Sequence, residues 1–170
     1  IRGPWRFREY DYMVIREAEL TLGPLVEALV AGKRPGDLPG IISRYDSPDR
    51  VYRPGPVLED LDSIDFPRYD WTNLSFYRRW DGQRLTPILA SRGCSWSRCR
   101  FCCEWCLFRK RSAKKVVDEL QWLVEQGSDV FQFNDSDVNG DPDLLLQVCE
   151  GIIRRNLKVK LTGQLRINKR

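Results

Sequence analysis

Histidine is missing from this sequence of 170 residues. Its absence excludes imidazole metal ligands, histidine bases and cysteine–histidine dyads, so any metal must be held by sulfur, carboxylate or backbone. Long apolar runs are missing as well, because no stretch approaches the length of about 20 residues that a membrane-spanning helix needs. The first residues do not form the apolar core of a signal peptide. We therefore expect a cytoplasmic chain with no membrane partner.

An initiating methionine is also lacking, since the sequence begins at Ile1, and this suggests that a longer protein continues upstream. Hydrophobic residues make up 42% and charged residues 31%, a composition that does not indicate disorder. The formal net charge of +4 only mildly favours an anionic partner.

Cysteine is present but unevenly distributed, because five of the six cysteines lie between Cys94 and Cys106. A disulfide framework would spread them along a small secreted chain, so the crowding predicts reduced thiols around a metal. In Cys99-x2-Cys102 a tight turn places two sulfurs on one side, and Cys94 can supply a third. Cysteine thiolates are the usual ligands of iron–sulfur clusters. Three of them would leave one iron of a 4Fe–4S cluster open.

The N-terminal part has the pattern of an α/β domain. Residues 11–15 predict a short buried strand, and Gly23-Pro24 opens a helix that ends at Gly32. From about residue 34 to residue 82 the chain is rich in proline and charge, which predicts an irregular linker. We expect scattered aromatic side chains to hold this linker against a surface: Tyr69, Trp71, Phe76, Tyr77 and Trp80.

The C-terminal part alternates strands and helices. Strands are predicted at 85–90, 130–133 and 157–161, with helices at 112–127 and 141–156 between them. This order predicts parallel strands joined by right-handed crossovers. Three strands cannot close a β/α barrel, which usually needs about 200 residues or more. The cysteine segment follows the first of these strands, at the end where barrel enzymes carry their chemistry.

Several motifs resemble the radical S-adenosylmethionine (SAM) superfamily. They are Arg92-Gly93-Cys94, Cys99-Arg-Phe101-Cys102 and the runs 108–112 and 116–120. The runs 11–22 and 131–140 are similar to the branch that has an N-terminal cobalamin-binding domain. The spacing of four residues between Cys94 and Cys99 departs from the superfamily's usual three, and some cobalamin-type members resemble this longer form.

The resemblance implies an α/β fold in fragment form. Residues 1–40 would be the C-terminal remnant of a Rossmann-like cobalamin-binding domain, and residues 41–83 a linker. Residues 84–170 would be the N-terminal half of a radical SAM (β/α) barrel. The histidine that coordinates cobalt in many relatives would lie upstream of this chain.

The resemblance also implies an enzyme that binds a 4Fe–4S cluster and SAM and generates a 5′-deoxyadenosyl radical. Methylation through cobalamin, bound in the full-length protein, is one expected reaction. The substrate is unknown, no catalytic residue is named, and the expected electron donor is a protein such as flavodoxin or ferredoxin. By position in the motifs, the cluster ligands are Cys94, Cys99 and Cys102, and the cofactor-binding residues are Phe101, Asp135, Gln164 and Arg166.

The roles of these cofactor-binding residues are likewise taken from the resemblance. Phe101 matches an aromatic position that packs near the adenine. Asp135 lies where the family contacts the methionyl amino group. Gln164 and Arg166 follow the last strand and are expected to reach SAM or the substrate.

A cysteine-rich zinc-binding module that interacts with nucleic acid is the alternative. Cys103-x2-Cys106 supplies a second knuckle, but Cys102 and Cys103 are adjacent and leave no loop between the two knuckles. We interpret Cys103 and Cys106 as local or substrate-side thiols, and Cys149 as a small hydrophobe on a helix. The basic stretch 98–115 is expected to be a solvated face, so a nucleic-acid partner is not favoured.

A calcium site is rejected. Residues 135–140 fit the opening half of an EF-hand loop, but the twelfth position is Leu146 where a bidentate glutamate is needed. A strand precedes the loop where an EF-hand needs a helix. We therefore interpret Asp137 as a solvated turn residue.

Overall fold

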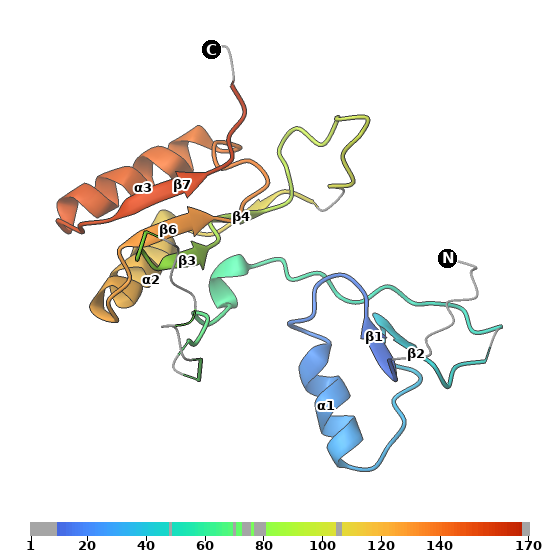
Figure 1. Cartoon of the computed structure of the whole chain (residues 1–170). Coiled ribbons are helices and arrows are strands. Elements are labelled where there is room, and N and C mark those ends of the chain that lie inside the picture. Colours follow the sequence, from blue (N-terminus) through green and yellow to red (C-terminus); the bar gives the residue numbers. More distant parts are fainter. Residues whose placement is uncertain are drawn as a thin grey trace. The chain divides into compact units, whose positions relative to one another are not determined.

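The protein is described by a computed structural model that covers residues 10–47, 49–69, 71–72, 76, 81–104 and 107–167. The chain divides into two compact units, Ile1–Glu59 and Asp60–Arg170 (Figure 1). No helix among the described residues is long and apolar enough to cross a membrane.

In its described residues, the first unit contains a two-stranded antiparallel sheet and one helix. Strand β1 (Tyr12–Val14) pairs with β2 (Ile41–Ser43), and helix α1 (Leu22–Val30) lies between them in the sequence. The predicted strand and helix are both present, but β1 is half-buried and not buried. Leu25 is the buried residue of α1.

Strand β2 corrects the prediction of an irregular segment at this point. It lies inside the range 41–83, where proline and charge masked a short apolar strand whose Ile41 is only 1% exposed. Just before it, Gly40 has φ +80°, and a Cβ there would come within 2.8 Å of the Gly55 Cα. Only glycine allows this approach of two backbones. The units divide at 59/60, within the predicted linker, and the predicted domain limits stay predictions.

The aromatic side chains of this range behave differently from one another. Tyr69 is half-buried and packs against the hydrophobic core of the second unit, as predicted. Trp71 and Phe76 are exposed by 84% and 82%, so the prediction that they hold the chain to a surface is wrong. Tyr77 and Trp80 lie outside the described residues.

The second unit is built on a parallel sheet in the order β3-β6-β7. The strands are β3 (Leu85–Ile88), β6 (Val130–Phe133) and β7 (Lys160–Gly163), with Ile88 opposite Phe133 and Phe133 opposite Gly163. The predicted parallel order is confirmed. The described strands form an open sheet, not a closed barrel. Pro87 is tolerated because β3 is an edge strand here, where a missing N–H costs no ladder bond on the outer side.

Strand β7 begins later than the predicted range 157–161. Asn156 adopts φ +52°, and the Leu157 N–H donates to the Ile152 carbonyl oxygen at 3.1 Å, which closes the end of the preceding helix. Leu157 and Val159 then pack against the core. The ladder starts where the Lys160 N–H meets the Asp129 carbonyl oxygen at 2.8 Å. The alternation of apolar residues in 157–161 thus covers the segment that leads into β7 as well as the first residues of the strand.

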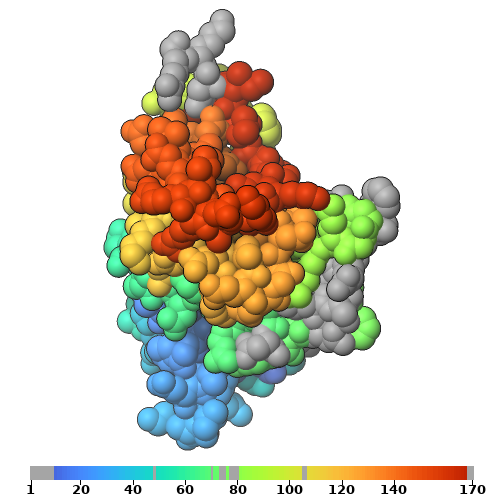
Figure 2. Space-filling view, turned by 90° about the vertical axis from the view of Figure 1, so that its left-hand side faces the viewer, coloured from blue at the N-terminus to red at the C-terminus, as the bar shows by residue number. Residues whose placement is uncertain are grey.

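Helices α2 (Ala113–Glu125) and α3 (Pro142–Arg154) pack against this sheet around one apolar core (Figure 1). Ser112 caps α2 by accepting from the Lys115 N–H at 3.1 Å, and Asp141 caps α3 by accepting from the Leu144 N–H at 3.0 Å. In Figure 2, α3 and the residues that follow it are seen at the surface in orange to red. The 3-10 helix Leu61–Ser63 joins this unit through Asp62, which accepts from the Ser112 N–H at 2.9 Å.

Candidate functional site

The cysteine loop, residues 93–108, is closed at its base by a two-residue antiparallel ladder. Strand β4 (Ser91–Arg92) pairs with β5 (Arg109–Lys110), and the Arg111 N–H donates to the Ala90 carbonyl oxygen at 2.8 Å just beyond it. The loop leaves the sheet at the end toward which the arrows of β6 and β7 point (Figure 1). Gly93 has φ +77°, a conformation that turns the chain away from β4 directly before Cys94.

The three predicted ligands are free thiols in this loop. Cys94 is half-buried, whereas Cys99 and Cys102 are exposed. The Cys102 N–H donates to the Cys99 carbonyl oxygen at 3.3 Å, so these two cysteines flank a tight turn, as predicted. Cys103 is a further exposed free thiol, and Cys106 lies outside the described residues.

Among the residues that the structure describes, no three histidine, cysteine, aspartate or glutamate side chains come close enough together to hold a metal. The donor chemistry nevertheless fits an iron–sulfur cluster, because three unpaired thiols lie within nine residues and no disulfide competes for them. Which sulfurs bind a cluster therefore stays a prediction.

Asp135 lies directly beyond β6 and is 3% exposed. Its carboxylate accepts from the Ala90 N–H at 3.0 Å and from the Ser91 hydroxyl at 2.5 Å. Burial raises the pKa of this carboxyl, and the hydrogen bonds from Ser91 and from the backbone oppose that rise. The residue thus ties the end of β6 to the start of β4, at the base of the cysteine loop.

The β6–α3 loop, residues 134–141, touches the cysteine loop at further points. The Ser136 hydroxyl donates to the Glu104 carboxylate at 2.5 Å, and Lys110 forms an ion pair with Asp141. A Cβ on Gly140 would lie 3.1 Å from the Phe108 ring and 3.2 Å from the Ser95 hydroxyl. The absence of a side chain at position 140 therefore lets the two loops pack closely.

Arg166 is brought to this region from the segment after β7. Its guanidinium carbon lies 4.6 Å from the centre of the Trp96 ring, in the cysteine loop. Its Nε is 3.7 Å from a carboxylate oxygen of Asp137. Gln164 is exposed, and its carbonyl oxygen accepts from the Val138 N–H at 2.9 Å. Both predicted residues therefore lie beside the β6–α3 loop.

Asp137 is not the solvated turn residue that the sequence suggested, because it is only 3% exposed. Phe101, by contrast, is 90% exposed between two of the cysteines, and its predicted packing near an adenine stays a prediction. The sequence gives one sign that Asp137 is buried. It stands two residues after Asp135, and in an extended chain side chains two residues apart point to the same side.

Two arginines of the basic stretch also differ from the prediction of a solvated face. Arg109 and Arg111 are 9% and 7% exposed. Arg111 forms an ion pair with Glu119 of α2. Burial raises the pKa of Glu119, and the charge and hydrogen bond of Arg111 oppose that rise. The signal in the sequence is Glu119 itself, which stands among the apolar residues of the inner face of α2.

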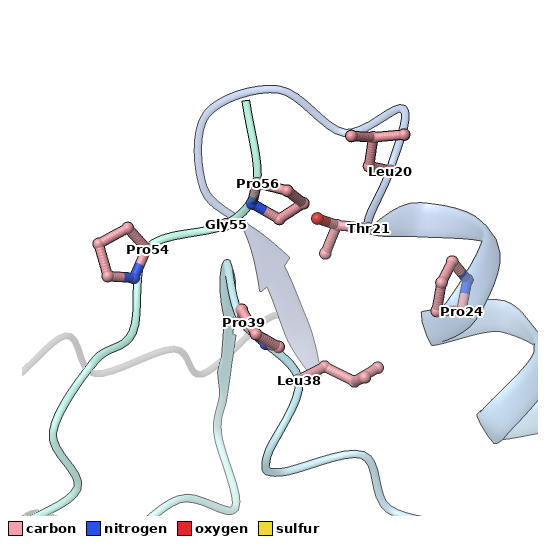
Figure 3. A pocket seen from close by; sticks show the side chains of 8 residues that line it. All are labelled: Leu20, Thr21, Pro24, Leu38, Pro39, Pro54, Gly55 and Pro56. Atoms are coloured by element: carbon pink, nitrogen blue, oxygen red, sulfur yellow. The ribbon is translucent and has the colours of Figure 1, made fainter. Parts of the chain in front are cut away.

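A hollow of about 230 Å³ lies beside this ion pair. It is lined by residues of the 61–69 segment, by β3 and by polar side chains that include Arg92, Arg111 and Asn134. A second hollow, of about 400 Å³, lies in the first unit (Figure 3). Its lining is mostly apolar and rich in proline, so its residues offer little chemistry beyond the hydroxyl of Thr21.

Free thiols follow the first strand of a parallel sheet with crossover helices, and this arrangement can be compared with known proteins. No protein-family model matches the chain. The chain is a relative of the cobalamin-dependent radical SAM enzymes, and the resemblance seen in the motifs is confirmed.

Two solved structures are similar to this chain. The cobalamin-dependent SAM radical enzyme OxsB matches with a TM-score of 0.72 and 20% identity, covering 91% of this chain and 22% of that chain, which establishes a shared fold. The radical SAM methyltransferase TsrM from Kitasatospora setae matches with a TM-score of 0.65 and 27% identity, covering 86% of this chain and 29% of that chain. A further TsrM structure holds cobalamin and a 4Fe–4S cluster.

Curated relatives point in the same direction. The anaerobic magnesium-protoporphyrin IX monomethyl ester cyclase of Synechocystis is 29% identical over 164 residues, 93% of this chain and 32% of the relative. The cyclase of the same name from Rubrivivax gelatinosus is 32% identical over 170 residues, 92% of this chain and 29% of the relative. An uncharacterised methyltransferase of Pyrococcus horikoshii is 29% identical over 163 residues, 93% of this chain and 35% of the relative. The chain spans about a third of the length of these proteins, and they do not support the zinc-binding alternative.

Proposed function

We propose that this chain is the cluster-bearing part of a radical SAM enzyme, with Cys94, Cys99 and Cys102 as ligands of a 4Fe–4S cluster. The observation that carries the proposal is the cysteine loop itself. It holds three free thiols within nine residues, and the β4–β5 ladder fixes its base at the end of a parallel sheet. A closed electron-transfer cluster would need a fourth thiolate, which the motif does not supply at the same spacing.

The bound cofactors would supply the chemistry of the reaction: a 4Fe–4S cluster held by Cys94, Cys99 and Cys102 would provide the electron for reductive cleavage of SAM. The protein positions and shields them. In our proposal Phe101 covers the adenine, Asp135 orients the amino group of the methionyl moiety, and residues after β7, Gln164 and Arg166, face SAM or the substrate. Asp135 suits an orienting role because Ala90 and Ser91 already hold its carboxylate in place.

The architecture of the intact protein is part of the proposal. Residues 84–170 would begin a β/α barrel whose later strands follow β7, and residues 1–40 would end a cobalamin-binding domain, with 41–83 between them. Support comes from the parallel sheet and from the cobalamin-dependent neighbours. The proposed cofactors are the 4Fe–4S cluster, SAM and cobalamin.

For the reaction we propose methyl transfer through cobalamin to an unactivated carbon of a small molecule, because methyltransferases are found among both the relatives and the solved structures. The relatives named as cyclases favour radical cyclisation as the second candidate. A small electron-transfer protein such as flavodoxin or ferredoxin would reduce the cluster, and the enzyme would act in the cytoplasm.

The test is anaerobic reconstitution of the intact protein with iron and sulfide, in the wild type and in three single variants, Cys94→Ala, Cys99→Ala and Cys102→Ala. We expect about four iron atoms per wild-type chain and loss of the cluster in each variant, because each variant removes one of the three proposed ligands. Iron and acid-labile sulfide are measured directly.

Cys103→Ala and Cys149→Ala are the matched controls, since both remove a free thiol that the proposal leaves outside the ligand set. They should retain the full iron content. The assignment is wrong if Cys103→Ala loses the cluster while one of the three proposed ligand variants keeps it.

A further inference from the structure

The backbone of Arg166 is held on both sides by one side chain. The Asn139 amide nitrogen donates to the Arg166 carbonyl oxygen at 2.7 Å, and the Arg166 N–H donates to the Asn139 amide oxygen at 3.0 Å. An asparagine that satisfies both polar groups of another residue's backbone fixes that residue in place. The backbone of Arg166 is therefore anchored to the β6–α3 loop independently of any contact that its side chain makes.

From this anchored backbone the guanidinium reaches the Trp96 ring at 4.6 Å, well within cation–π range. Trp96 stands two residues after Cys94 and is 45% exposed. Arg98, within the same loop, also lies over this ring, at 5.3 Å. Of these two arginines, Arg166 comes from outside the loop, so its contact links the cysteine loop to the segment after β7.

A buried acid completes the arrangement. Asp137 is 3% exposed, and neither of its carboxylate oxygens has a hydrogen-bond partner among the described residues. Arg166 Nε, 3.7 Å away, is likewise buried without a hydrogen bond. A buried carboxylate with no hydrogen bond depends on its counter-ion, because an isolated buried charge is very costly. Asp137 thus holds the arginine side chain, and Arg166 in turn keeps Asp137 from being an unpaired charge.

We propose that Asp137 and Arg166 form a positioning clamp that holds Trp96 and fixes the part of the cysteine loop between Cys94 and Cys99. The clamp acts through Trp96 and needs no direct contact with a cofactor. Its consequence for the cluster rests on the proposed function, whereas its effect on the loop does not. In the metal-free protein it keeps the loop ordered, and in the loaded protein it slows the departure of iron.

The first test follows amide hydrogen exchange of the peptide that spans the cysteine loop in the metal-free intact protein. Arg166→Met and Trp96→Leu should each speed exchange in this loop about tenfold, which corresponds to about 1.4 kcal/mol. The double variant should exchange no faster than either single variant, because both remove the same contact. Arg68→Met is the matched control, since Arg68 lies over Trp71 at 5.9 Å, with Trp71 exposed and far in sequence from the cysteines.

Charge and shape are separated by two further variants. Arg166→Lys keeps a cation beside Asp137 but lacks the flat group that covers the indole, so it should leave overall stability near the wild type while the loop still exchanges faster. Asp137→Asn added to Arg166→Met should recover the stability that Arg166→Met loses, because no unpaired charge is left buried. Unfolding in urea measures both effects.

The loaded protein gives an independent measurement. Loss of iron to a chelator should be about tenfold faster in Arg166→Met than in the wild type, with Arg68→Met unchanged. Unaltered loop exchange in both Arg166→Met and Trp96→Leu would overturn the clamp, even in a protein that loads a full cluster. Faster loop exchange in a protein that takes up no iron would support the clamp and overturn the proposed function.

Discussion

The short hydrogen bond between Ser91 and Asp135 gives a direct test at the scale of single residues. Ser91→Ala removes the hydroxyl that donates to the Asp135 carboxylate at 2.5 Å. Asp135, which is only 3% exposed, is then left with fewer hydrogen-bond donors. We expect a loss of about 1–3 kcal/mol in the free energy of unfolding, the range for stripping a buried charged group of a hydrogen bond. Urea unfolding of the intact protein measures it.

Ser128→Ala is the control for this change. It removes another buried hydrogen bond, in which the Thr86 hydroxyl donates to the Ser128 hydroxyl at 2.9 Å, and neither of these groups carries a charge. We expect the smaller loss of about 1 kcal/mol that is usual for a neutral pair. An equal loss in both variants would mean that Asp135 is not ionised in the folded protein.

The pH dependence of Asp135 follows from the direction of its pKa. Burial raises the pKa of the folded carboxyl above its ordinary value of 3.8, so the folded state holds the proton more tightly than the unfolded state. The penalty for ionising Asp135 is fully present above the folded pKa and is relieved as the pH falls toward 3.8. The wild type should therefore gain stability relative to Asp135→Asn as the pH falls through this window. A constant difference between the two proteins across the window would contradict the raised pKa.

At the scale of elements, Gly140 tests whether the β6–α3 loop shapes the cysteine loop. In Gly140→Ala the new Cβ would lie 3.1 Å from both the Asp137 carbonyl oxygen and the Phe108 ring, and 3.2 Å from Ser95. The contact with the Asp137 oxygen would distort the β6–α3 loop itself, and the contacts with Phe108 and Ser95 would push this loop away from the cysteine loop. We expect this overpacking to cost about 1–3 kcal/mol. Cluster loading should fall, as measured by iron content after reconstitution.

Gly23→Ala is the matched control for this substitution, because nothing lies within 4 Å of its added Cβ. Alanine at position 23, in helix α1, should leave iron loading unchanged and slightly raise stability. Full loading in Gly140→Ala would show that the close packing of the two loops is not needed to form the site.

The helices and strands also show how much of the fold could be predicted from the sequence. Helices α2 and α3 and strand β6 were predictable, because their caps at Ser112 and Asp141 and their apolar periodicity agree. Strand β2 was missed because the pairing of Ile41 with Val14 is a tertiary contact with little local signal. The β4–β5 ladder is two residues long and is hidden by the charge of Arg92, Arg109 and Lys110.

In the candidate site, too, some features could be predicted from the local sequence and others depend on tertiary contacts. The three cysteines can be found from their spacing, because a short loop keeps its members close in space, whereas Asp135 was identified from the family resemblance and its place after a predicted strand. The burial of Asp137 and its pairing with Arg166 depend on how the segment after β7 meets the β6–α3 loop. Contacts of this kind join residues that are far apart in the sequence, so only the folded chain reveals them.

At the scale of the whole molecule, this chain corresponds to only a part of its relatives. The second unit offers an open three-stranded sheet, and the relatives are about three times as long as this chain. The proposed cluster and its supporting loops lie within the second unit. Electron transfer to the cluster and cleavage of SAM are the functions that this part should provide.

The central claim is that three thiolates leave one iron free to bind SAM. The most direct measurement is the electron paramagnetic resonance spectrum of the reduced, reconstituted protein, recorded with and without SAM. We predict the signal of a reduced 4Fe–4S cluster whose g values shift when SAM is added, because SAM becomes a ligand of the open iron. A cluster signal that SAM leaves unchanged, or no cluster signal at all, would contradict this account.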